Sequence, residues 1–66
     1  MYIVLNGEKT KWDKGKNVSE LVKNKIGKIQ GVAIAINQKL ILRAAYGETE
    51  ILEGDEVEIL TAHPGG

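Results

Sequence analysis

The sequence predicts a single α+β domain in which one main helix packs on one face of a mixed sheet of four to five strands. Two β-rich runs separated by Asn6-Gly7 indicate a hairpin, and a capped amphipathic segment after Asn17 indicates the helix. The alternation of large and small residues in Val32–Ile36 indicates a further strand. The 66 residues are too few for a second domain, because autonomous domains usually need at least about 50 residues.

The hairpin begins with Met1–Leu5, a short apolar run rich in residues that favour strands. Asn6-Gly7 follows, and this pair readily adopts the positive φ angles of a type I′ turn. Glu8–Trp12 is the returning strand, because its lysines alternate with other residues and can face water.

The helix is predicted from its cap and from its apolar stripe. Asn17 and Glu20 have the spacing of a capping box, in which the Asn17 side chain accepts from the backbone N–H of Glu20. Gly27 suits a left-handed stop. A helix this short is unstable alone in water, and its apolar stripe must therefore pack against an apolar surface of the domain. The stripe consists of Val18, Leu21, Val22 and Ile26.

The second half of the chain supplies the surface for that stripe. In Val32–Ile36 the three large residues can face the helix while the alanines face the other way. Leu40–Leu42 is another short strand, and Val57–Thr61 is the last one. Residues 44–52 show no clear period, which predicts a long irregular connection that Tyr46 pins to the core.

With the helix crossing between the hairpin and the later strands, and the last strand beside the first, this order of elements gives the β-grasp arrangement. We expect the β-grasp domain to occupy residues 1–62 and a flexible tail to occupy residues 63–66.

Catalysis by the chain itself is disfavoured by what the sequence lacks. It contains no cysteine, so no disulfide, thiolate metal site or cysteine nucleophile can form. Its one histidine, His63, is the fourth residue from the end, where neither a catalytic triad nor a metal cluster can gather around it. We therefore expect a protein that is not an enzyme and that binds no metal and no cofactor of its own.

Charge is segregated along the chain. Residues 1–43 contain all nine basic residues and three acidic ones, and residues 44–66 contain six acidic residues and none that is basic, so the two segments carry +6 and −6. Nucleic-acid-binding proteins usually have uncompensated positive charge, and we expect no nucleic-acid partner. No apolar run approaches the roughly 20 residues of a membrane span, and the N-terminus lacks the pattern of a signal peptide. We expect a cytoplasmic monomer without membrane contacts.

The C-terminal pair Gly65-Gly66 is the feature that points to chemistry. Chance would place two glycines there with a probability of roughly 0.5% at a glycine usage of about 7%. Pro64 is stiff and extended and the glycines have no side chains, so this tail could enter a slot too narrow for any Cβ. The Gly66 carboxylate is a poor electrophile at neutral pH. A nucleophile can attack it once its oxygen has become a leaving group, for which ATP-dependent adenylation is the favoured route.

The chain resembles the ubiquitin-like sulfur carriers, and among them the ThiS family of thiamine thiazole biosynthesis. The resemblance covers the whole chain, and the short length favours ThiS over the longer small subunit of molybdopterin synthase. It rests on Val32–Asn37 before a turn, Arg43 followed by Tyr46, Leu52–Ile59 leading into the last strand, and Gly65-Gly66.

The resemblance implies a reaction cycle at Gly66. A ThiF-type adenylating enzyme would use ATP and magnesium to convert the Gly66 carboxylate to an acyl-adenylate, with Gly65 threading the slot. Sulfur from a persulfide donor of the cysteine desulfurase or rhodanese type would then give a thiocarboxylate. A ThiG-type thiazole synthase would take that sulfur. The absence of cysteine agrees with this cycle, because no internal thiol can divert the activated terminus.

We expect docking to use the sheet face that the helix leaves open, together with Pro64 in the tail. Strand alternation places Tyr2 and Val4 on that face with Glu58 and Leu60, and apolar residues there would form a patch that a partner can cover. Ala33 and Ala35 are expected on the same face.

Two other functions are compatible with the same residues. The chain could be a protein modifier, or a carrier for another pathway such as molybdopterin, thiolated tRNA or cysteine synthesis. It could also be a non-covalent β-grasp module that binds RNA or protein through the lysines between Lys9 and Lys28. Removal of Gly66 separates these classes, because a carrier would lose all activity and a binding module would not.

Overall fold

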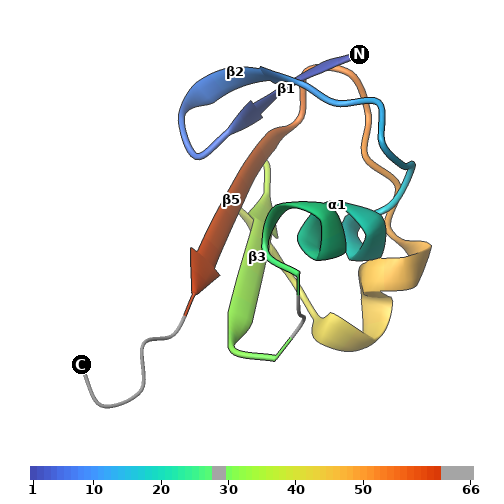
Figure 1. Ribbon diagram of the computed structural model, residues 1–66. Helices are drawn as coiled ribbons and strands as arrows, with labels where there is room; N and C mark the ends of the chain where they lie inside the picture. The colour runs from blue at the N-terminus through green and yellow to red at the C-terminus, as the bar shows by residue number, and fades with distance from the viewer. Residues whose placement is uncertain (28–29, 62–66) are drawn as a thin grey trace.

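The computed structural model describes residues 1–27 and 30–61, in which a mixed sheet is covered on one face by a single α-helix (Figure 1). The predicted fold class and the β-grasp arrangement are confirmed. The expected division between a domain at 1–62 and a tail at 63–66 lies outside the described residues and stays a prediction.

The sheet has five strands in the spatial order β2-β1-β5-β3-β4. The central pair, β1 and β5, is parallel, and every other neighbouring pair is antiparallel. The first and last strands of the chain are therefore adjacent, as the sequence predicts. The strands are β1 (Tyr2–Leu5), β2 (Glu8–Lys11), β3 (Val32–Ile36), β4 (Lys39–Ile41) and β5 (Glu56–Thr61).

Both antiparallel hairpins turn through residues with positive φ. Asn6 and Gly7 have φ of 49° and 85°, which confirms the predicted turn between β1 and β2. Asn37 and Gln38 have φ of 51° and 71° between β3 and β4. An asparagine tolerates this left-handed region better than most residues do, and each turn uses one at its first position.

Helix α1 (Val18–Lys25) begins as its capping box predicts. The Glu20 backbone N–H donates to Asn17 Oδ1 at 2.9 Å, and Glu20 Oε1 accepts from the backbone N–H groups of Lys16 and Asn17 at 2.8 and 3.3 Å. Gly27 has φ of 93° just after the helix, which is the predicted left-handed stop.

The connection after β4 differs from the sequence expectation. Arg43–Glu48 is a 3-10 helix, η1, and not an irregular segment. Its first bond runs from the Ala45 N–H to the Leu42 carbonyl at 2.8 Å, and the Thr49 hydroxyl donates to the Ala45 carbonyl at 2.7 Å. A turn this short and this tight does not show the 3.6-residue period by which helices are recognised, which is why the pattern appeared irregular.

The core lies between α1 and the sheet and extends under η1 (Figure 1). Tyr46 is 2% exposed, so it pins η1 to the core as the sequence predicts. Its hydroxyl donates to the Val32 carbonyl at 3.3 Å. The buried residues are Ile3, Trp12, Val18, Leu21, Val22, Ile34, Ile36, Tyr46, Ile51, Val57 and Ile59.

Candidate functional site

The candidate site is the sheet face opposite α1, which we call the outer face. Ile3 is buried against the helix side, so its neighbours Tyr2 and Val4 point to the outer face. Val57 and Ile59 are buried in the same way, which puts Glu56, Glu58 and Leu60 outward. The predicted positions of Tyr2, Val4, Glu58 and Leu60 on this face are therefore confirmed; their contact with a partner stays a prediction.

Three exposed leucines form an apolar cluster at one end of the outer face. Leu60 lies opposite Ala33, and Leu40 lies opposite Ala35. Leu42 follows the last residue of β4 and is the N-cap residue of η1. The three leucines are 65, 68 and 69% exposed, in the order Leu60, Leu40 and Leu42. We call these three leucines with Ala33 and Ala35 the leucine cluster.

The other end of the outer face combines aromatic and basic side chains. Tyr2 lies opposite Lys11 and Val4 opposite Lys9, all of them on the β1–β2 hairpin. Lys9 Nζ lies 4.8 Å from the centre of the Tyr2 ring, within the range of a cation–π contact. The Tyr2 ring is therefore already partly covered by a cation.

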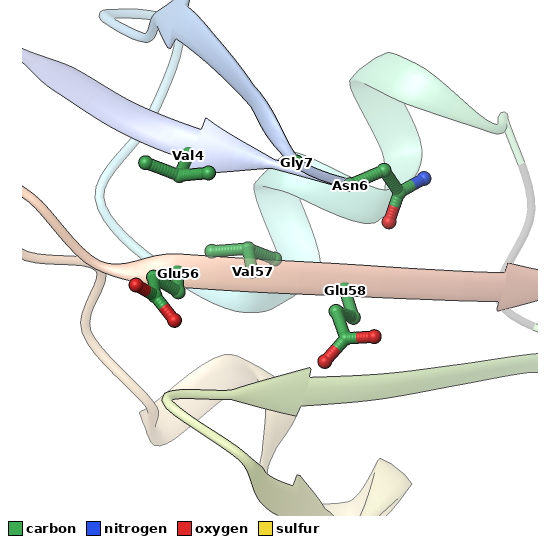
Figure 2. A pocket seen from close by; sticks show the side chains of 6 residues that line it. All are labelled: Val4, Asn6, Gly7, Glu56, Val57 and Glu58. Carbon is green, nitrogen blue, oxygen red and sulfur yellow. The ribbon is translucent and has the colours of Figure 1, made fainter.

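A hollow of ≈ 450 Å³ separates the two ends. Figure 2 shows the side chains of Glu56 and Glu58 on the same side of β5, and Glu56 is the residue that pairs with Val4 of β1. Among the residues that the structure describes, no Lys or Arg nitrogen comes within 4.0 Å of either carboxylate. The hollow is lined by Val4, Asn6, Gly7, Glu56, Val57 and Glu58.

The structure thus divides the residues that the sequence placed in one patch. Val4 lies opposite Glu56, and Leu60 lies four residues farther along β5, beyond Glu58. Glu56 therefore lies beside Val4, and along β5 the Glu58 carboxylate lies between this position and Leu60. The sequence interpretation missed Leu40 and Leu42; in the structure Ile41 between them is half-buried, and strand alternation then places both leucines outward.

The tail that the sequence singles out follows directly from this face. Strand β5 is described as far as Thr61, one residue beyond Leu60, so the tail follows a residue next to the leucine cluster. Pro64, Gly65 and Gly66 lie outside the described residues, and their roles stay predictions.

In the described part of the chain, residues 1–27 and 30–61, no cluster of three or more His, Cys, Asp or Glu side chains is arranged to hold a metal ion. No helix in the same part combines the length and apolarity needed to span a membrane.

Comparison with known proteins gives one family and closely similar folds. The model of the ThiS family matches residues 3–66. The crystal structure of a thiamine biosynthesis protein (ThiS) from Geobacter metallireducens is 30% identical, with a TM-score of 0.83 and coverage of 100% of both chains. A solution NMR structure of a thiamine biosynthesis protein from the same organism has a TM-score of 0.80 at 30% identity, covering 100% of this chain and 88% of that one. No curated protein sequence matches the chain.

Proposed function

The chain belongs to the ThiS family of small carrier proteins, and we propose that it carries sulfur on its C-terminal glycine for the thiazole ring of thiamine. Family membership supports a sulfur carrier role, and the match over residues 3–66 is the observation on which the proposal rests. The reacting atom is the carbonyl carbon of Gly66, and the folded domain is the surface by which partner enzymes recognise it.

The proposed chemistry begins with activation. A Gly66 carboxylate oxygen attacks the α-phosphorus of magnesium-bound ATP in a ThiF-type enzyme, and pyrophosphate leaves. The terminal sulfur of a donor persulfide then attacks the acyl carbon, and AMP leaves with the bonding electrons. A thiol attacks the donor-side sulfur of the resulting acyl disulfide, which leaves a thiocarboxylate on Gly66 and a disulfide between the thiol and the donor. The thiocarboxylate gives its sulfur to a ThiG-type thiazole synthase.

Covalent geometry limits how far this chemistry can lie from the fold. The five residues after Thr61 span at most about 18 Å when fully extended. An enzyme that reacts with Gly66 must therefore contact the end of the sheet from which the tail departs. The leucine cluster lies at that end, so we assign it as the principal docking surface.

Intact mass spectrometry tests the proposal. The protein is incubated with ATP, magnesium, a ThiF-type enzyme and a persulfide donor, and the expected product gains the mass difference between one sulfur and one oxygen on Gly66. A variant with one alanine appended after Gly66 is the control, because it retains every native residue and only blocks the reactive end. Conversion of the appended variant, or no conversion of the native protein, would contradict the proposal.

Delivery of the sulfur is tested separately from its loading. The loaded protein is mixed with a thiazole synthase and its other substrates, and loss of sulfur from Gly66 should accompany thiazole formation. A carrier of another pathway would load normally and would fail in this second step. A binding module would bind its partner equally well after deletion of Gly66.

A further inference from the structure

Asn6 makes three hydrogen bonds to β5, two of them through its side chain. Its backbone N–H donates to the Val57 carbonyl at 2.8 Å. Its Oδ1 accepts from the Ile59 N–H at 2.8 Å, and its Nδ2 donates to the Ile59 carbonyl at 3.4 Å. The side-chain amide therefore pairs with both backbone groups of one residue, as the peptide of a neighbouring strand would.

This pairing compensates for the early end of β1. The strand stops at Leu5, and the chain turns away through Asn6 and Gly7, yet β5 continues to Thr61. Figure 2 shows Asn6 where β1 ends, next to β5. Beyond this point β3 pairs with β5 on one edge, and the Asn6 side chain extends the pairing on the other.

A second asparagine performs the equivalent task at the opposite end of β5. Asn37 Oδ1 accepts from the Glu56 N–H at 3.0 Å, and Asn37 Nδ2 donates to Asp55 Oδ1 at 3.1 Å. Asn37 also lies in a hairpin turn with positive φ. The two asparagines thus resemble each other in conformation and in number of side-chain bonds, and differ in which end of the strand they hold.

We propose that Asn6 is a positioning residue for the reaction of the tail, an inference that rests on the function proposed above. Ile59 lies two residues before the end of β5, so the bonds to its backbone fix the direction in which the chain leaves the sheet. With that direction fixed, docking of the outer face also aims Gly66 at the partner's active site. Without it, the docked protein presents its terminus over a wider range of positions, and fewer of them react.

The test compares Asn6→Gly with Asn37→Gly. Glycine accepts the positive φ at either position without strain, so each variant loses two side-chain hydrogen bonds and little else. Adenylation by a ThiF-type enzyme is followed as pyrophosphate release over a range of carrier concentrations. Thermal unfolding of both variants sets an assay temperature at which each is folded, and amide exchange of Ile59 reports whether the end of β5 has loosened.

For Asn6→Gly we expect kcat to fall by at least about threefold while KM changes by less than about twofold. The variant still docks, but the position of Gly66 relative to the partner's active site is less well defined. Asn37→Gly should leave both constants within about twofold of the native values. Equal effects of the two variants, an unchanged kcat in Asn6→Gly, or a change confined to KM would overturn the positioning role. If the native protein itself releases no pyrophosphate, the proposed function has failed, and the role of Asn6 in that reaction fails with it.

Discussion

Substitution of Leu60 by aspartate tests the docking surface most directly. Leu60 is 65% exposed, so its side chain contributes little to the core, and we expect the free energy of unfolding to change by no more than about 0.5 kcal/mol. Full burial of a leucine side chain is worth about 1.5–3 kcal/mol, so covering the exposed two thirds of Leu60 in a complex contributes roughly 1–2 kcal/mol. Loss of that contribution corresponds to about a 5- to 30-fold lower kcat/KM for adenylation. A carboxylate facing an apolar partner surface would add to the loss.

Leu52→Asp is the matched control for this experiment. Leu52 is 56% exposed and belongs to no strand. Leu52→Asp therefore makes the same chemical change on a similarly exposed leucine that is not part of the outer face of the sheet. We expect its kcat/KM to remain within about twofold of the native value. Pyrophosphate release at low carrier concentration gives kcat/KM, and thermal unfolding confirms that both variants are folded. Equal losses in the two variants, or none in Leu60→Asp, would refute the assignment of the docking surface.

Two further substitutions test other parts of the molecule. Leu42→Asp should lower kcat/KM about as much as Leu60→Asp does, because both leucines belong to the leucine cluster and are similarly exposed; a normal rate would remove Leu42 from the docking surface. Gly15→Ala should lower the free energy of unfolding by about 1–2 kcal/mol, because the added Cβ would lie 2.6 Å from Glu20 Cβ and displace the capping side chain. Gly47→Ala is the control, because its added Cβ has no neighbour within 4 Å, and its free energy of unfolding should be unchanged or slightly higher. Chemical denaturation measures both variants. An equal loss of stability in the two would exclude the clash with Glu20 as the cause.

Local patterns in the sequence were sufficient to predict most of the fold. The turn at Asn6-Gly7, the cap at Asn17 and the alternation in Val32–Ile36 each depend on residues close together in the chain, and each is confirmed. The β-grasp order follows from them, because a single short helix must cover the one apolar sheet face available. The 3-10 helix at Arg43–Glu48 was missed because its bonds span three residues and its sequence has no helical period.

The outer face was harder to predict because it depends on register. Strand alternation placed Val4 and Leu60 on the same face, but alternation says nothing about how far apart two residues of different strands lie. The parallel pairing places Val4 beside Glu56, so Leu60 lies four residues farther along β5 with the Glu58 carboxylate in between. The bond between Asn6 and Ile59 joins residues 53 positions apart, and nothing in either neighbourhood of the sequence indicates it.

The position of the core along the chain allows effects on activity to be separated from effects on the free energy of unfolding. The last core residue along the described chain is Ile59, and Leu60 next to it already faces outward. Substitution of Leu60 therefore removes no buried apolar contact of the described core, so its effect on the unfolding free energy should be small. An activity lost through a change at Leu60 can accordingly be read as lost recognition. A loss of activity in Asn6→Gly must be compared with Asn37→Gly, because the Asn6 side chain bonds to β5 and its removal can also lower stability.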